Sequence, residues 1–440
     1  MQRSIVRPRF GILFVLSILL SLVAVGCGPE SSASKQAELG SATVRWATWD
    51  RNSPAETMLV KQFQEENPQV EFKREEMTSN ALNTLKAAPP DLLNMDIRYE
   101  FNTLLDQGKL ADLSDLWEET GLHDQIPASL QRLSERDGKQ FYIPFGFGWV
   151  GFYYNKQIFA QYNLQPPENW SQFLLLCETL ALNGETPLAL AGADPWSSYE
   201  WFEYLDLRLN GPEFHRNLQQ GKESFQDERV RNVLESWKSL FDLGYFVQGA
   251  KTTQGLSALT SIMRAEKIEM LNRDRAVMAL SDAYYASQLP APFMQQVGFF
   301  RFPVIDPSLP VAEAVDAFGY VIPVGSDNPS HAIAFLRQVS TPQSALLVAQ
   351  QGIFSSVTYA PSRKDVELSG TRADQQGAMA MIQAADETVP YLWLALPDPT
   401  WGMMQYHFTR FATTWDVDAF MGKLEEARQE GIKKGLFKEQ

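Results

Sequence analysis

The first patterned stretch of the chain alternates apolar and polar residues, with Val44 and Trp46 on one face, and this alternation predicts a β-strand. The residues that follow predict a helix. Ser53 can cap its first turn, Pro54 suits the first helical position, and Glu56 completes a capping box. The chain therefore opens with a strand followed directly by a helix.

The same alternation of strand and helix continues over the next 40 residues. Residues 70–72 and 91–95 read as strands, and residues 79–87 and 98–107 read as helices. Strands and helices that alternate in this way form a parallel sheet with helices packed on its faces. The sequence thus predicts an α/β fold.

Beyond this region the pattern is less regular. Residues 141–154 form an extended segment rich in aromatic residues and glycine, and residues 194–198 read as a turn. The last 100 residues are mostly helical in pattern. The other elements predicted are strands at 187–190, 275–280, 297–302 and 318–324, and helices near 200–209, 226–243 and 255–270.

The first 26 residues have the three parts of an export signal. Three arginines and no acid precede an apolar run over residues 10–25, which is short for a membrane span. The run ends in Ala-Val-Gly-Cys at residues 24–27, which resembles a bacterial lipobox. That resemblance implies cleavage before Cys27 and a lipid on Cys27. Residues 28–41 are rich in Ser, Ala and Gly without a pattern, so residues 27–41 are expected to be the lipidated cysteine and a flexible tether. An ordinary signal peptide with an incidental cysteine is the alternative.

Composition narrows the possible classes of function. Removing residues 1–26 leaves 414 residues, which suits two lobes better than one compact core. The net charge of −15 becomes about −18 without the three arginines, so nucleic acid is a poor candidate partner. Cys177 lies in an apolar helical run and is predicted to be a buried small hydrophobe.

Signals for catalysis or metal binding are weak. The four histidines are scattered, and P-loop, G-x-S-x-G and H-E-x-x-H motifs are absent from the sequence. A pair of carboxylates could cleave a glycoside, but the chain holds 53 acids and no pair stands out. The adjacent tyrosines at 153–154 and 284–285 raise the alternative of ferric iron. Residues 151–155 read better as a strand, where neighbouring tyrosines point to opposite faces.

Aromatic residues stand beside charged ones in several predicted loops. Trp49 and Asp50 follow the first strand, and residues 96–100 follow the third, so both segments lie at the carboxyl edge of one sheet, where open α/β folds bind ligands. A sugar ring can lie flat on an aromatic ring while carboxylates and arginine bind its hydroxyls. Similar pairs occur at Asp194–Trp196, Asp282–Tyr284 and Asp398–Trp401, the last just ahead of a predicted helix.

Several fragments along the chain form a recognisable series. They are Trp46-Ala47-Thr48-Trp49, residues 63–68, 90–93, 108–113, 142–144, 153–156 and 167–170, and Arg275-Ala276-Val277-Met278. Taken in order, these fragments resemble one known family, the extracellular solute-binding proteins of family 1, which are the maltose-binding-like receptors of ABC sugar importers. Asn169 stands where that family has threonine, and the resemblance spans nearly all of the predicted mature chain.

The resemblance implies a periplasmic-binding-protein-like fold of type II. Two α/β lobes, each with a central mostly parallel sheet and helices on both faces, would close around one ligand. Neither lobe is continuous in sequence. The expected N-terminal lobe comprises residues 42–146 and 319–368, and the expected C-terminal lobe comprises residues 147–318 and 369–440.

The resemblance also implies a function. The expected protein is a lipid-anchored, monomeric receptor outside the cytoplasmic membrane that binds a neutral sugar or glycoside, without catalysis, cofactor or metal, and delivers it to ABC permease subunits. Two departures concern the ligand, since the family often has Trp at Tyr284 and an acid near Gly148. A secreted glycoside-cleaving enzyme, or a receptor for ferric iron or polyamine on the same fold, are the alternatives. The expected ligand-binding residues are Trp49, Asp50, Asp96, Arg98, Trp149, Trp196, Tyr284 and Trp401.

Overall fold

The computed structural model describes residues 39–77, 81–247, 255–262, 275–351 and 359–437. The expected signal peptide, Cys27 and nearly all of the tether lie outside the described residues. Within the described ranges, no helix is both long and apolar enough to cross a membrane.

The first six elements confirm the alternation of strand and helix that the sequence predicts. Ser53 Oγ accepts a hydrogen bond from the Glu56 backbone N–H at 3.4 Å, so Ser53 caps the helix as expected. The predicted capping box is wrong, because the Ser53 backbone N–H donates to the Asp50 carbonyl oxygen at 3.0 Å and the Glu56 carboxylate accepts from Thr48 and Asn94. β1 pairs in parallel with both β2 and β3. The elements are β1 (Ala42–Thr48), α1 (Pro54–Glu66), β2 (Val70–Glu76), α2 (Ala81–Ala87), β3 (Leu92–Asp96) and α3 (Tyr99–Asp106).

The remaining elements form a longer and less regular series, in which helices outnumber strands. They are α4 (Ser114–Thr120), α5 (Leu122–Gln125), α6 (Ala128–Ser134), β4 (Glu135–Arg136), β5 (Lys139–Gln140), β6 (Ile143–Asn155), α7 (Lys156–Gln161), α8 (Trp170–Leu182), β7 (Leu188–Ala189), α9 (Pro195–Leu209), α10 (Gly211–Gln219), α11 (Glu228–Asp242), α12 (Gly255–Thr260), β8 (Met278–Asp282), α13 (Ala283–Ser287), α14 (Ala291–Met294), β9 (Val297–Phe300), β10 (Ala312–Val321), α15 (Pro329–Val339), α16 (Pro342–Gln351), β11 (Ala360–Pro361), α17 (Ala373–Gln383), β12 (Glu387–Pro390), α18 (Leu392–Ala395), α19 (Asp398–Thr414) and α20 (Val417–Lys433).

Two predicted loops are helix starts instead. The turn predicted at residues 194–198 is wrong, because α9 begins at Pro195 and the Asp194 carboxylate caps it by accepting the Trp196 backbone N–H at 3.0 Å. Trp401 likewise lies within the first turns of α19 rather than ahead of it. In both places proline occupies the start of a helix, where its missing N–H costs nothing.

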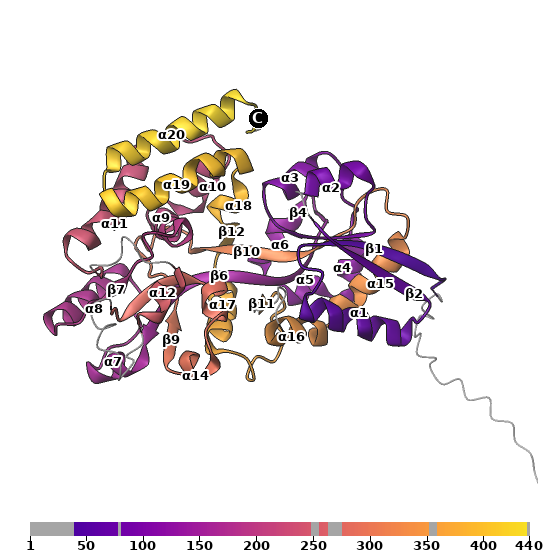
Figure 1. Ribbon diagram of the computed structural model, residues 1–440, viewed down its shortest axis with the longest axis horizontal. Helices are drawn as coiled ribbons and strands as arrows, with labels where there is room; N and C mark the ends of the chain where they lie inside the picture. Colours follow the sequence, from indigo (N-terminus) through magenta and orange to yellow (C-terminus); the bar gives the residue numbers. More distant parts are fainter. Residues whose placement is uncertain (1–38, 78–80, 248–254, 263–274, 352–358, 438–440) are drawn as a thin grey trace, which may run out of the picture. The chain divides into compact units, whose positions relative to one another are not determined.

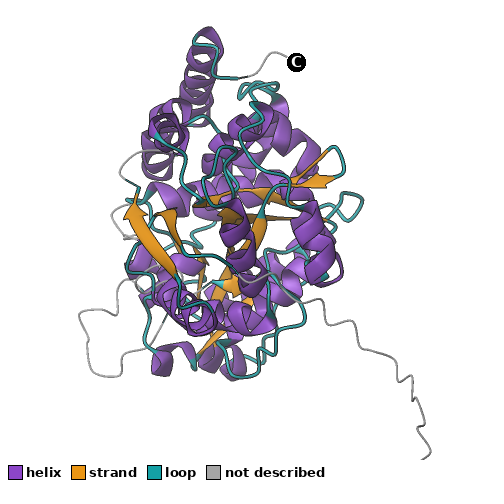
Figure 2. Cartoon of the chain, turned by 90° about the vertical axis from the view of Figure 1, so that its right-hand side faces the viewer, coloured by secondary structure: helices purple, strands orange, loops and turns teal. Residues whose placement is uncertain are grey.

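A mixed sheet runs through the described body, in the strand order β2-β1-β3-β10-β6-β8-β7. Figure 1 shows β6 and β10 side by side across the middle of the molecule. The first half of β6 pairs with β10 and its second half pairs with β8 and β9. Helices lie on both faces of these strands (Figure 2). The antiparallel pairs arise where the chain returns through β6 and β10.

Two large hydrophobic cores flank the middle of the sheet. They divide within β6 between Trp149 and Val150, and within β10 between Ala314 and Val315. We call them the first core and the second core. The first core includes Val44, Trp46, Leu93, Phe101, Trp117, Phe335 and Ile382, and the second core includes Phe152, Cys177, Trp201, Trp237, Phe302, Phe408 and Leu424.

Two predictions about buried side chains are confirmed. Cys177 is fully buried, and burial raises the pKa of its thiol far above the ordinary value, which makes it an inert small hydrophobe. Tyr153 is buried in a third, smaller core, whereas Tyr154 is half-buried against the second core. The neighbouring tyrosines of β6 therefore point to opposite faces of the strand.

Gly319 on β10 packs tightly against β6. The register between the two strands shifts between Phe318 and Gly319. A Cβ atom at Gly319 would lie 2.2 Å from the Ile143 carbonyl oxygen and 2.8 Å from the Tyr142 ring. The Tyr142 hydroxyl donates to the carbonyl oxygens of Met95 and Ala317, at 2.8 and 2.9 Å. The buried tyrosine ring thus fills the space that a side chain at 319 would need.

Candidate functional site

A cavity of about 540 Å³ opens beside the carboxyl ends of β1, β3 and β8. Its walls are mostly aromatic rings and carboxylates, and they come from segments far apart in the sequence. Its size is ordinary for a small-molecule site. The lining residues are Trp49, Asp96, Arg98, Gly148, Trp196, Tyr199, Asp282, Ala283, Tyr284, Tyr285, Asp316, Tyr359, Tyr391 and Trp393.

The cavity brings together five of the eight residues expected to bind ligand, namely Trp49, Asp96, Arg98, Trp196 and Tyr284. They come from the loop after β1, the loop after β3, and the starts of α9 and α13. Tyr284 is about half exposed at the mouth. The other three expected residues, Asp50, Trp149 and Trp401, are not among the described residues that line the cavity.

Each of those three residues has another structural place. Asp50 shapes the loop that carries Trp49, because its carboxylate accepts the Asn52 backbone N–H at 2.8 Å. Trp149 is fully buried, since side chains alternate along a strand and its neighbour Gly148 is the one that faces the cavity. Trp401 is 7% exposed and packs behind Trp196, with ring centroids 5.7 Å apart.

Arg98 is held at one side of the cavity between two indole rings. Its guanidinium carbon lies 5.5 Å from the centroids of both Trp49 and Trp393. Asp96 forms an ion pair with the same guanidinium. Burial opposes the charge, but the carboxylates of Asp96 and Asp316 outweigh it and raise the pKa of Arg98. Arg98 is therefore a fixed, permanently charged hydrogen-bond donor.

Three carboxylates, Asp96, Asp316 and Asp282, lie along the neighbouring strands β3, β10, β6 and β8, and we call this side of the cavity its floor. Asp316 on β10 stands directly opposite Gly148 on β6, and Asp282 on β8 stands opposite Val150. Asp96 on β3 stands opposite the residue two positions from Asp316, so the carboxylates share one face of the sheet. Burial raises the pKa of Asp316 well above its ordinary value, and the charge of Asp96 raises it further.

Asp282 has a structural contact as well as a place in the floor. It caps α13 by accepting the Tyr285 backbone N–H at 2.9 Å. Burial raises the pKa of Asp282 to about 6, and the nearby Asp194 carboxylate contributes in the same direction. Asp194 in turn accepts hydrogen bonds from the Tyr285 hydroxyl and from the Gly255 backbone N–H. These bonds join the starts of α9, α12 and α13 beside the cavity.

The cavity wall also contains aromatic residues that the sequence did not predict. Trp393 packs edge-on against Trp196 with ring centroids 4.9 Å apart, and Tyr391 packs against Tyr199 at 6.2 Å. Tyr391 and Trp393 follow β12 directly. Aromatic residues were selected from the sequence where they follow predicted strands. Tyr391 and Trp393 were missed because residues 387–390 were not predicted to be a strand. Asp316 and Tyr359 were missed because no local pattern marks them.

Four polar atoms of the wall have no hydrogen-bond partner among the described residues. They are Trp49 Nε1, Arg98 Nε, Asp316 Oδ1 and the Tyr391 hydroxyl, and each is shielded from water. The set comprises two donors, one carboxylate acceptor, and one hydroxyl that can do either. A cavity ligand that both donates and accepts hydrogen bonds would satisfy these atoms.

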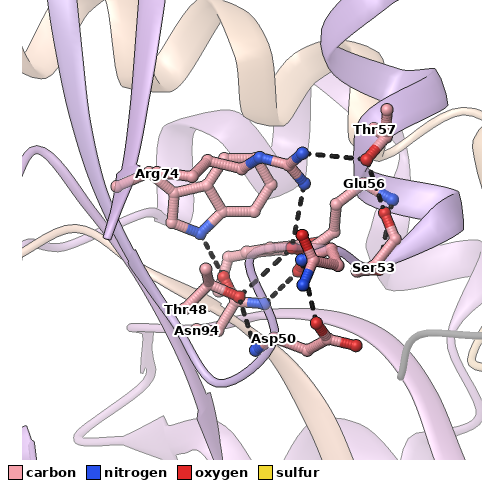
Figure 3. Close-up of polar contacts among 10 residues, drawn as sticks. Thr48, Asp50, Ser53, Glu56, Thr57, Arg74 and Asn94 are labelled. Carbon is pink, nitrogen blue, oxygen red and sulfur yellow. Dashed lines mark hydrogen bonds and ion pairs between the residues drawn. The ribbon is translucent and has the colours of Figure 1, made fainter. Parts of the chain in front are cut away.

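A buried polar network supports the loop that carries Trp49 (Figure 3). Thr48 Oγ1 donates to the Glu56 carboxylate at 3.2 Å and accepts the Asp50 backbone N–H at 3.3 Å. The Asn94 side-chain amide also donates to Glu56. Burial raises the pKa of Glu56 to about 8, partly offset by Asn94 and by the charge of Arg74. The network connects β1, β3 and α1 beneath the cavity rim.

Among the described residues, no group of three or more His, Cys, Asp or Glu side chains is placed to hold a metal ion. The floor carboxylates and Arg98 instead provide charged hydrogen-bonding groups among aromatic rings, which suits a polar, uncharged ligand with apolar faces.

Comparisons with known proteins agree with this geometry. An ABC transporter extracellular-binding protein of Pyrococcus horikoshii is 22% identical over 450 residues, covering 97% of both chains. A multiple sugar-binding protein of Streptococcus mutans is 26% identical over 218 residues, covering 46% of this chain and 48% of its own length. The solved structure of AcbH, a bacterial solute receptor described as preferring β-D-galactopyranose, superposes with a TM-score of 0.79 at 20% identity, covering 91% of this chain and 99% of AcbH.

The AcbH superposition identifies the architecture as the two-lobed type II fold of solute receptors. The family model of bacterial extracellular solute-binding proteins matches residues 47–345, which is more than half of the chain. This chain therefore belongs to the family of bacterial extracellular solute-binding proteins.

Proposed function

We propose that this protein is the receptor of an ABC importer for a short neutral saccharide or glycoside, which it binds without chemical change. The observation that carries the proposal is the cavity wall, where aromatic rings alternate with four shielded, unpartnered polar atoms of both donor and acceptor type among the described residues. A sugar offers apolar ring faces to the former and hydroxyls to the latter. The sugar-binding relatives and the AcbH neighbour support the same ligand class.

The proposed mechanism is closure of two lobes around the ligand. The first and second cores divide within β6 and β10, so we propose these two strands as the hinge segments. The lobes expected from the sequence, 42–146 with 319–368 and 147–318 with 369–440, would then have their boundaries moved to residues 149/150 in β6 and 314/315 in β10. Because α17 packs into the first core through residues such as Ile382, we assign α17 to the first lobe. Ligand favours the closed state only through contacts that the open state lacks.

The proposed location follows from the N-terminal sequence. Cys27 would carry the lipid anchor, and the protein would act as a monomer outside the cytoplasmic membrane, where the permease subunits bind its closed form. Stable anchoring takes more than one acyl chain, which a bacterial lipoprotein cysteine would supply. A membrane-fractionation experiment with Cys27→Ser tests the anchor, since the variant should move entirely to the soluble fraction.

The direct test of function is a ligand screen on the tag-free mature protein. We expect at least one of D-galactose, D-glucose, sucrose, trehalose and raffinose to raise the melting temperature, because a ligand at 100 times its Kd stabilises the fold by about 2.7 kcal/mol. Putrescine and ferric citrate serve as comparison ligands for the other receptor classes. Chromatography of the same sugars after incubation should show no product. Sugar cleavage, or stabilisation by putrescine or iron alone, would contradict the proposal.

Two tryptophans that the sequence analysis grouped together should respond differently to replacement. Trp49→Ala removes a cavity wall and a donor, so we expect affinity to fall roughly 10- to 100-fold with little change in stability. Trp401→Ala empties a buried site, so we expect unfolding to become easier by about 3–5 kcal/mol. Calorimetry and urea denaturation measure the two effects. Affinity lost more in Trp401→Ala than in Trp49→Ala would contradict this site.

A further inference from the structure

We infer that Asp316 is the specificity-determining residue of the cavity, and that it anchors one ring of the saccharide over Gly148 by accepting a hydrogen bond from a ring hydroxyl. This inference rests on the proposed function and assigns one defined contact within it. Asp316 is not among the eight residues that the sequence predicted to bind ligand. The pairing of β10 with β6 brings it to the cavity.

The geometry of the floor creates a slot at this point. Asp316 and Gly148 are direct partners in the antiparallel pair of β10 and β6, and both line the cavity. A Cβ atom at Gly148 would lie 3.0 Å from the Tyr359 ring and 3.5 Å from the Asp316 Cβ. Glycine therefore keeps open the space between the aromatic ring and the carboxylate, where any side chain would project into the position proposed for the ligand.

The three floor carboxylates differ in the hydrogen-bond or ion-pair partners that they have within the protein. Asp96 is paired with Arg98, and Asp282 caps α13. Asp316 Oδ1 is shielded from water and accepts no hydrogen bond from the described residues. Leaving such an oxygen unsatisfied is costly, whereas a ligand hydroxyl that donates to it from about 2.7 Å removes that cost.

A second unsatisfied group supports the same position for the ligand. The Tyr391 side chain is 4% exposed, lines the cavity, and has a hydroxyl with no partner in the described ranges. A phenol hydroxyl can donate to a ring or glycosidic oxygen as well as accept. An acceptor at Asp316 and an adaptable hydroxyl at Tyr391 fit a polyol better than a purely apolar ligand.

The arrangement also explains a departure seen in the sequence. The resemblance led us to expect an acid near Gly148 on β6, and glycine stands there instead. The structure places the Asp316 carboxylate on the neighbouring strand directly opposite this glycine. A carboxylate is thus present beside Gly148, but it belongs to β10 and not to β6. From β10 it would contact a different hydroxyl of the sugar.

The test compares Asp316→Asn with Asp137→Asn, which makes the same chemical change at an exposed hairpin position. The probe is whichever of D-galactose, D-glucose, sucrose, trehalose and raffinose stabilises the wild-type protein most. We expect calorimetry to show affinity falling about 10- to 100-fold in Asp316→Asn and unchanged in Asp137→Asn. The ligand-free melting temperature of Asp316→Asn should equal or exceed that of wild type, because a purely structural carboxylate would lower it when replaced.

A series of monodeoxy derivatives of the same sugar tests direct contact. For wild type, one derivative should bind more weakly than the parent sugar by the same factor by which Asp316→Asn weakens binding of the parent sugar. Asp316→Asn should bind this derivative and the parent sugar with equal affinity. Equal affinity of the parent sugar for wild type and Asp316→Asn, or additive losses for every derivative, would overturn the inference while leaving the proposed function intact. If wild type binds none of the sugars, the inference and the proposed function are both wrong.

Discussion

Replacing Gly319 by alanine is expected to destabilise the protein by at least about 3 kcal/mol, because the new methyl group would lie 2.2 Å from the Ile143 carbonyl oxygen. Neither strand can move away easily. The Tyr142 ring fills the adjacent space, and its hydroxyl is bonded to two backbone carbonyl oxygens. Urea denaturation followed by tryptophan fluorescence measures the change in the free energy of unfolding.

Gly402→Ala is the matched control for this prediction. Gly402 lies on the exposed face of α19, and a Cβ atom there would meet nothing within 4 Å. Alanine in a helix is favoured over glycine by about 0.5–1 kcal/mol, so this variant should be slightly more stable than wild type. Equal stability of Gly319→Ala and wild type would show that β6 and β10 are not packed as the structure has them.

Glu56→Gln is expected to flatten the dependence of stability on pH. Burial raises the pKa of Glu56 in the folded protein to about 8, from an ordinary value of 4.5. Between these values the folded state holds a proton that the unfolded state has released, so wild-type stability falls as pH rises. The loss is up to about 1.4 kcal/mol per pH unit, or roughly 3 kcal/mol between pH 5 and 8. Glutamine resembles the protonated acid and cannot ionise.

The measurement is the free energy of unfolding at several pH values from 5 to 8.5. The stability of Glu56→Gln relative to wild type should rise with pH and level off above about pH 8. Glu65→Gln, an exposed position on the same helix α1, is the control and should follow the wild-type pH profile. Parallel profiles for wild type and Glu56→Gln would show that Glu56 carries its charge in the folded state.

Figure 3 shows why this titration concerns the site as well as stability. The Glu56 carboxylate accepts a hydrogen bond from Thr48 Oγ1. Thr48 Oγ1 in turn accepts one from the backbone N–H of Asp50, the residue after Trp49. Ionisation would leave a buried negative charge in this network with Arg74, at 3.8 Å, as its cationic neighbour, and a buried charge is costly. We therefore expect the loop carrying Trp49 to be held best below the pKa of Glu56.

Local sequence was sufficient for the first six elements, β1 to α3. Ser53, Pro54 and Glu56 mark the start of α1, and the alternation at Val44 and Trp46 marks β1, because caps and side-chain periodicity depend only on neighbouring residues. Local sequence misled where two signals overlapped. Asp194 and Pro195 suit a turn and a helix start equally well, and only the structure shows that α9 begins there.

Some residues of the candidate site could be predicted from local sequence, and others could not. The sequence alone determined the family resemblance, the α/β class, and the wall residues that follow strands, such as Trp49 and Arg98, because these depend on residues adjacent along the chain. Tertiary structure alone decided that Asp316 faces Gly148, that Trp393 packs against Trp196, and that Trp401 lies behind the wall. The physical reason is that pairing between distant strands and packing between distant helices set which side chains share a cavity, and neither leaves a periodic trace in the sequence.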